Sequence, residues 1–261
     1  MLRLAFAADG TGAPVGVALR QAERDGPVAV EAQGDAAPDA LLTQVARILS
    51  LDGDGDAWAA VGEREPLIGG LQARFGGLRP VLFASPYEAA CWAVISARLG
   101  REEAMRLRDA IAGAHGQAFK LAGEVRRAWP APATLLAALE AERVIGLPGE
   151  KLRRLHGVAT AAAAGALDAS RLHALGPEGA ADALGELRGF GAFYRELVVV
   201  GGVGFTDAPS AQDARARRAA AQLHGLGDLD AERFAALAEA WRPFRAWATV
   251  LLRASADRDG L

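Results

Sequence analysis

The sequence has a single cysteine among its 261 residues, and this scarcity excludes several kinds of site. One thiol cannot build a disulfide framework, a zinc site with several thiolates or an iron–sulfur cluster held by cysteines alone. The four histidines are scattered without metal-ligand spacing, so we expect surface or structural roles for His115, His156, His173 and His224. We therefore expect no cofactor.

The sequence also lacks an uncharged apolar run of about 18 residues, the length that a membrane-spanning helix needs. Its first ten residues are interrupted too early for the apolar core of a signal peptide. We expect a cytoplasmic monomer without a membrane partner, associated with the nucleoid if the source is bacterial. The length is sufficient for one large domain or two small ones.

A strongly basic character is missing as well, because the formal net charge is −3. Phosphate binding usually leaves a basic footprint, so this value at first argues against nucleic acid. The acidity is local, however: residues 1–66 carry five Lys or Arg against eleven Asp or Glu, and residues 67–261 carry 24 against 21. A charge of +3 in the longer part permits weak, salt-sensitive binding to DNA.

Ala, Leu and Arg are abundant, and this composition favours helices. Only the N-terminal region differs: Val15–Leu19 and Pro27–Glu31 are short β-prone runs bounded by turn residues, and residues 38–49 have apolar residues at helical spacing. The Asp-Gly repeat at 51–56 resembles part of a calcium loop without its downstream Glu, and its alternative is a turn that caps the next helix.

From residue 66 onward the pattern is helix, short turn, helix. Ser85 and Glu88 form a predicted capping box before an apolar helix, and Ser210 and Asp213 form another before an Arg-rich helix at 214–223. Further helices are expected at 101–114, from 134, at 180–187, 192–200, 231–240 and 243–252, with 192–200 apolar nearly all round and therefore buried. The sequence predicts a mostly α chain with an acidic α+β lobe at 1–66 and a helical region at 67–261.

The segment Leu184–Ala192 contains a Gly-Phe-Gly turn between two predicted helices. Glycines permit a tight turn, and the amides at the start of the second helix are free to bind an anion. An ordinary helix–helix turn is the alternative, since Gly-x-Gly alone is a weak signal.

The residues around this turn resemble the helix-hairpin-helix (HhH-GPD) DNA glycosylase superfamily, in particular its 3-methyladenine DNA glycosylase II branch. The stretch Gly189–Asp213 follows the family pattern from hairpin to aspartate without a gap. The other landmarks, in family order, are Tyr87-Glu88, then Gly146-Leu147 with Lys151, and Trp241-Arg-Pro-Phe-Arg-Ala-Trp-Ala248. The resemblance covers about residues 45–255 and implies two helical lobes behind a small N-terminal α+β lobe.

The resemblance implies a glycosylase for damaged, alkylated bases in duplex DNA, with Asp213 as the catalytic carboxylate. Breaking an N-glycosidic bond develops positive charge on the sugar, which a carboxylate stabilises while it orients water. The alternative is that Asp213 merely caps a helix. Phe193 stands where bifunctional relatives carry a Schiff-base lysine, so the resemblance implies a monofunctional enzyme; an ordinary core aromatic is the alternative.

The resemblance also implies a set of DNA contacts. The hairpin amides of Gly189, Gly191 and Ala192 would hold a phosphate, with a monovalent cation at the carbonyls near Leu187 and Gly189. Other implied phosphate contacts are Arg188, Lys151, Arg153, Arg154, Arg215 and Arg217. Arg98 or Leu99 would fill the place of the flipped base. The implied base pocket consists of Phe193, Leu197, Arg253 and Tyr87.

Two departures from the family bear on substrate choice. Ala97-Arg98 replaces the usual glutamine pair, and Leu197 and Arg253 stand where the family often has Tyr and Trp. Electron-rich rings capture cationic alkylated bases, whereas an arginine repels them or donates to a neutral lesion. Two alternatives therefore stay open: a non-catalytic or altered-specificity DNA-binding homologue with a degenerate pocket, and a helical interaction protein without a DNA role.

Overall fold

The computed structural model describes residues 1–23, 26–144, 146–208 and 210–259. An antiparallel sheet opens the chain, with strand order β1 (Leu2–Ala7), β2 (Pro14–Gln21) and β3 (Val28–Gly34). Helix α1 (Pro38–Ile48) packs on it through a small core that includes Phe6, Val17 and Val45. The strands predicted around 15–19 and 27–31 and the helix at 38–49 are confirmed. Strand β1 was missed, because Leu and Ala are weak β signals and only its pairing with β2 defines it.

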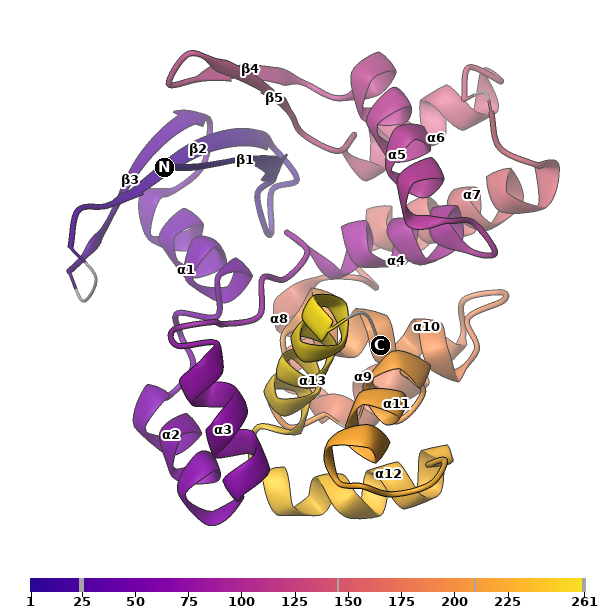
Figure 1. The fold of residues 1–261 in the computed structure, drawn as a ribbon. Coiled ribbons are helices and arrows are strands. Elements are labelled where there is room, and N and C mark those ends of the chain that lie inside the picture. The colour runs from indigo at the N-terminus through magenta and orange to yellow at the C-terminus, as the bar shows by residue number, and fades with distance from the viewer. Residues whose placement is uncertain (24–25, 145, 209, 260–261) are drawn as a thin grey trace.

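Helices form most of the remaining chain (Figure 1). In order they are α2 (Gly55–Arg64), α3 (Pro66–Arg74), α4 (Pro86–Ser96), α5 (Arg101–His115), α6 (Pro132–Glu140), α7 (Gly149–Ala163), α8 (Ala169–Ala174), α9 (Gly176–Gly185), α10 (Ala192–Val198), the π-helix η1 (Val199–Val203), α11 (Ala214–Leu223), α12 (Ala231–Ala238), the 3₁₀ turn η2 (Glu239–Trp241) and α13 (Arg245–Asp259). A β-hairpin, β4 (Ala118–Leu121) and β5 (Glu124–Arg127), interrupts them. The predicted mostly α architecture is confirmed.

The first helical lobe is built around α4, which is buried over nearly its whole length. The Ser85 hydroxyl accepts a hydrogen bond from the Glu88 amide at 3.1 Å, so the predicted cap at the start of this helix is confirmed. The Glu88 side chain does not complete the capping box. It is buried beside Arg108, and burial raises the pKa of Glu88 to about 7. Helices α5, α7, α10 and η1 all pack against α4.

The second helical lobe joins helices from both ends of the chain. Its core combines Val61 and Ile68 of α2 and α3 with residues of α11, α12 and α13 and with the fully buried Trp241 of η2. Figure 1 shows α3 beside α13. The Asp54 carboxylate accepts from the amides of Asp56 and Ala57 at 3.0 Å, so the Asp-Gly repeat caps α2, as the capping alternative predicted.

The β4–β5 hairpin ties the N-terminal sheet to the first helical lobe. Phe119 packs against Ala18 of β2, and the Arg3 guanidinium donates to the Leu121 carbonyl at 3.0 Å. Nothing in the sequence indicated this hairpin, because its four-residue strands are too short to show an alternating pattern. None of the helices in the described ranges combines the length and apolar character needed to cross a membrane.

The segment predicted as one buried helix at 192–200 differs from that expectation. Its first turn is exposed, with half of the Phe193 surface accessible, and after Val198 the helix widens into the π-turn η1. The widening brings Gly202 against the first turn of α4: a Cβ at this position would lie 2.8 Å from the Pro86 Cα and 2.9 Å from the Ala89 Cβ. A glycine is therefore required for this helix to reach α4.

We predict that Gly202→Ala lowers the free energy of unfolding by about 1–3 kcal/mol, because the added methyl group forces two packed backbones apart. The matched control is Gly201→Ala, where the new Cβ would meet only the Phe83 ring at 3.4 Å. Urea unfolding of both variants measures the difference. Equal stability of the two variants would contradict this role of Gly202.

Candidate active site

Asp213 lies at the seam between the two helical lobes, where it begins α11. Its Oδ1 atom accepts hydrogen bonds from the amides of Arg215 and Ala216 at 3.0 and 3.1 Å. The predicted capping box with Ser210 as N-cap is wrong, because the chain is still turning at Ser210 and Asp213 is itself the N-cap. Its Oδ2 atom takes no part in the cap and lies 3.3 Å from the Nε atom of Arg253 on α13.

The structure places the predicted pocket residues on three different helices and buries one of them in the core. Arg253 contacts Asp213 directly, and its side chain is half-exposed. Phe193 is exposed at the start of α10, and Leu197 is one turn further along the same helix, partly packed on the first core. Tyr87 lies elsewhere: it is buried in that core, and its hydroxyl donates to the Pro130 carbonyl at 3.1 Å.

The predicted hairpin joins α9 to α10 and exposes the start of α10. Gly189 has φ +83°, and a Cβ there would lie 2.9 Å from the Arg154 guanidinium, so glycine is needed for both conformation and space. Phe190 is buried and anchors the loop in the first core. The first amides of α10 that donate to Gly191 are those of Tyr194 and Arg195, at 3.0 and 3.1 Å. The amides before them have no acceptor within the helix and can bind an anion.

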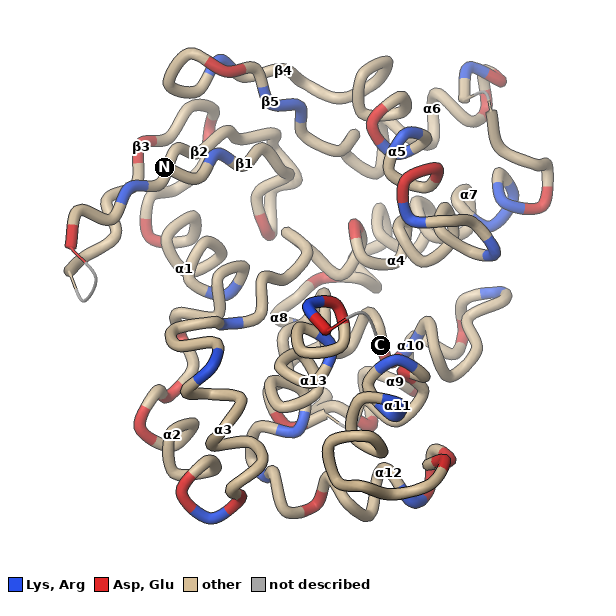
Figure 2. The backbone as a smooth tube through the Cα atoms, viewed as in Figure 1, with Lys and Arg blue, Asp and Glu red and all other residues tan. Residues whose placement is uncertain are grey.

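Basic side chains lie at this hairpin. Arg188 is exposed in the loop, and Figure 2 shows a basic segment at the tip of the loop before α10. Arg154 lies against Gly189 and is also paired with Glu150 at 3.1 Å. Ala192 is exposed, and the Leu187 carbonyl accepts from the Phe190 amide while keeping a second lone pair. Binding of a phosphate or a monovalent cation here stays a prediction.

Other residues predicted to contact DNA have protein partners. The Lys151 ammonium donates to the Ile95 carbonyl at 2.6 Å and thereby closes the C-terminal end of α4. Just beyond this end, Arg98 is exposed with φ +57°, whereas Leu99 is partly packed into the first core. Arg215 forms an ion pair with Asp257 of α13. Of these residues, Arg98 and Arg215 are exposed, and Arg215 is held by its ion pair.

A second carboxyl group, which the sequence motifs did not indicate, lies at the site. Both oxygens of Glu196, on α10, accept from the Gln212 amide, at 3.1 and 3.2 Å. Burial raises the pKa of Glu196 to about 7, and the negative charge of Asp213 adds to this effect. An acidic residue three positions after Phe193, in a segment whose only other charged residue is Arg195, was the available signal.

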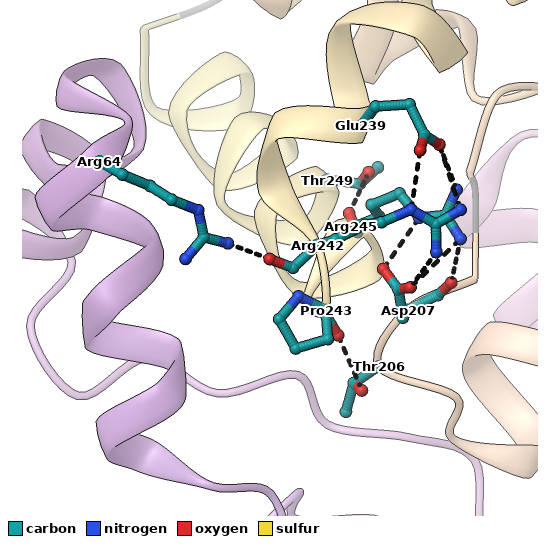
Figure 3. Close-up of polar contacts among 8 residues, drawn as sticks. All are labelled: Arg64, Thr206, Asp207, Glu239, Arg242, Pro243, Arg245 and Thr249. Carbon is teal, nitrogen blue, oxygen red and sulfur yellow. Dashed lines mark hydrogen bonds and ion pairs between the residues drawn. The ribbon is translucent and has the colours of Figure 1, made fainter.

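The segment that leads to Asp213 is fixed to the start of α13 by a charged network (Figure 3). The Arg245 guanidinium binds the Asp207 carboxylate at 2.9 Å and its carbonyl at 2.6 Å, and it also pairs with Glu239 at 2.7 Å. Arg242 reaches the same Asp207 carboxylate from the solvent side at 2.6 Å. The Thr206 carbonyl also accepts from the Ala246 amide at 2.9 Å. These contacts determine where the Asp213 loop leaves the first lobe.

No protein-family model and no curated protein matches this sequence. Solved structures do match, and three of them illustrate the range of structural similarity. A 3-methyladenine DNA glycosylase from Archaeoglobus fulgidus superposes with a TM-score of 0.82 at 22% identity, over 99% of this chain and 88% of that one. A Clostridium acetobutylicum 8-oxoguanine glycosylase/lyase in complex with DNA gives 0.72 at 15%, over 97% and 87%. The 3-methyladenine DNA glycosylase of Schizosaccharomyces pombe, in complex with abasic DNA, gives 0.63 at 21%, over 77% and 97%.

These likenesses extend over almost the whole chain for the first two structures. They show that the chain has the fold of the helix-hairpin-helix DNA glycosylases, and they confirm the fold that the resemblance implied. The N-terminal sheet is included in the match, because 99% of the chain is covered.

We predict that Arg245→Met lowers the free energy of unfolding by about 2–4 kcal/mol, because it leaves Asp207 and Glu239 without their buried partner. Arg242→Met is the matched control: it touches the same carboxylates from a half-exposed position and should cost less than about 1 kcal/mol. Chemical denaturation compares the two variants. Similar losses of unfolding free energy in the two variants would show that the burial of Arg245 adds nothing to the strength of its ion pairs.

Proposed function

We propose that this chain is a monofunctional DNA glycosylase that acts as a monomer on damaged, alkylated bases in duplex DNA. The observation that carries the proposal is Asp213. Its carboxylate stands at the seam of the two lobes. One oxygen is fixed by the cap of α11, and the other, Oδ2, lies beside the half-exposed Arg253 side chain. The fold around it is that of DNA glycosylases.

The proposed reaction assigns separate tasks to the parts of the site. The free hairpin amides at Gly189, Gly191 and Ala192, with Arg188 and Arg154 nearby, hold a DNA phosphate. The damaged base leaves the stack, a step that weak pairing facilitates, and it lies against the exposed Phe193 ring. Arg98, exposed on its turn, fills the space left in the duplex.

Bond cleavage then depends on charge stabilisation by Asp213. As the bond between sugar and base breaks, positive charge develops on the deoxyribose, and the Oδ2 atom stabilises it and orients the attacking water. Phe193 cannot form a Schiff base, so the proposed product is an abasic site with an intact strand. The modest charge of +3 in residues 67–261 limits the affinity for undamaged duplex.

We predict that Asp213→Asn reduces base release from damaged duplex DNA by at least about a hundredfold, because the amide caps the helix but carries no negative charge. Release is measured in single turnovers, with strand scission scored before and after alkali; the wild-type protein should need alkali for scission. Asp230→Asn is the control, since Asp230 caps α12 in the same way, through the Arg233 amide at 2.8 Å.

The same assay tests the alternative of a non-catalytic DNA-binding homologue. Two observations favour this alternative. The Arg253 guanidinium lies 3.3 Å from the Oδ2 atom of Asp213, and Tyr87, a predicted pocket residue, is buried in the first core. Binding of abasic duplex without base release from any of a wide panel of lesions would support the homologue and reject the enzyme. Full release by Asp213→Asn would reject the assigned residue.

We predict that Arg253 disfavours cationic bases. Arg253→Gln should raise the excision of 7-methylguanine relative to hypoxanthine by about tenfold, because a positive charge beside the pocket is removed. Arg258→Gln, five residues further along α13, is the control and should leave the ratio unchanged. An unchanged ratio in Arg253→Gln would show that this arginine does not select the lesion.

A further inference from the structure

Glu196 connects the two functional elements of the site. It lies on α10, whose first turn carries the free hairpin amides, and its carboxyl group accepts from the amide of Gln212, the residue before Asp213. Both carboxyl oxygens are within 3.2 Å of that amide nitrogen, so the side chain is aimed at the backbone and not at the solvent. A displacement of α10 therefore moves the loop that carries Asp213.

The opposite side of this loop is fixed as well. The Arg217 guanidinium, from the first turns of α11, donates to the Ala211 carbonyl at 2.7 Å. Glu196 and Arg217 thus hold the same peptide group, the one between Ala211 and Gln212: Glu196 accepts from its amide and Arg217 donates to its carbonyl. Asp213 follows directly, and the cap of α11 fixes its Oδ1 atom.

We propose that Glu196 is a positioning residue, which places the Asp213 carboxylate relative to the hairpin helix by holding the Gln212 amide. The proposal rests on the proposed function for its effect on catalysis. Small misplacements of a catalytic group can cost about a hundredfold in rate, so a single hydrogen bond at this place has a large effect on activity.

Two charged groups act on Glu196: Asp213 at the end of the loop and Arg217 on α11. Arg253 of α13 pairs with Asp213. Burial and the negative charge of Asp213 raise the pKa of Glu196 to about 7, whereas the Gln212 amide and Arg217 oppose that rise. Glu196 therefore changes charge in the neutral range, and its ionised form accepts the stronger, charge-assisted hydrogen bond from Gln212.

The sign of the pH effect follows from this shift. The folded protein favours the protonated carboxyl, so ionisation of Glu196 opposes folding increasingly from the ordinary value of 4.5 to about 7. Substitution by glutamine removes that opposition and should leave the protein folded. The rate of base release should rise as the pH increases through about 7, because the Gln212 amide is then held more firmly.

The test compares Glu196→Ala with Glu196→Gln in the full chain. Alanine removes the acceptor and should slow single-turnover base release by about ten- to a hundredfold with DNA affinity unchanged. Glutamine keeps an acceptor and should retain the rate within about threefold but lose the rise near pH 7. Glu178→Ala and Glu178→Gln are controls, because Glu178 is exposed at the start of α9.

A second measurement is independent of activity. Hydrogen exchange of the Gln212 amide, followed by NMR, should be about tenfold faster in Glu196→Ala and close to the wild-type rate in Glu196→Gln. The proposal would be overturned if both variants released base at the wild-type rate with the wild-type pH dependence. It would also be overturned if both variants lost the same fraction of the rate and kept the pH dependence. If the wild-type protein releases no base, the proposed function fails. The positioning role is tested separately, because an unchanged exchange rate of the Gln212 amide in Glu196→Ala would overturn it.

Discussion

The close contact between η1 and the first turn of α4 is the constraint on which the site geometry depends. Helix α4 is buried on nearly all sides, so it cannot move to accommodate a neighbour. The chain after the hairpin packs against it through α10 and η1, and at Gly202 the approach is so close that no side chain fits. Arg47 reinforces the approach, because its guanidinium donates to the Gly202 carbonyl at 2.8 Å while pairing with Asp9 of the N-terminal lobe. The direction in which the chain then leaves toward Asp213 is fixed by this contact.

From that point the loop is held at two places by two different lobes. Near its start, Arg245 fixes Asp207 to the second lobe, and near its end, Glu196 fixes Gln212 to the hairpin helix of the first lobe. Asp213 therefore occupies a defined position at the seam although the described residues of the loop, 204–208 and 210–212, form no helix or strand. A carboxylate fixed in this way needs little reorganisation when charge develops on a bound sugar, and this is the physical basis of the proposed catalysis.

The capping residues show how far the sequence could predict the structure. Ser85 and Ser210 have the same local signal, yet only Ser85 begins a helix, because the backbone around Ser210 is committed to the loop contacts with α10 and α11. The hairpin glycines were predictable, since a positive φ at Gly189 is a local requirement. Lys151 was assigned to DNA, but its ammonium closes α4, a contact between residues 56 positions apart that no local pattern reveals.

The sequence by itself determined the helical character, the hairpin, and the choice of Asp213 as the candidate carboxylate, because these depend on local propensity, on backbone freedom and on an ordered set of motifs. The tertiary structure decided which oxygen of Asp213 is available, that Arg253 lies against it, that Tyr87 is buried in the core, and that Glu196 supports the loop. Each of these results comes from packing between elements distant in the chain. Residues 1–66 illustrate the same division: their acidity was evident from composition, whereas only the fold shows α2 packed beside the C-terminal helices.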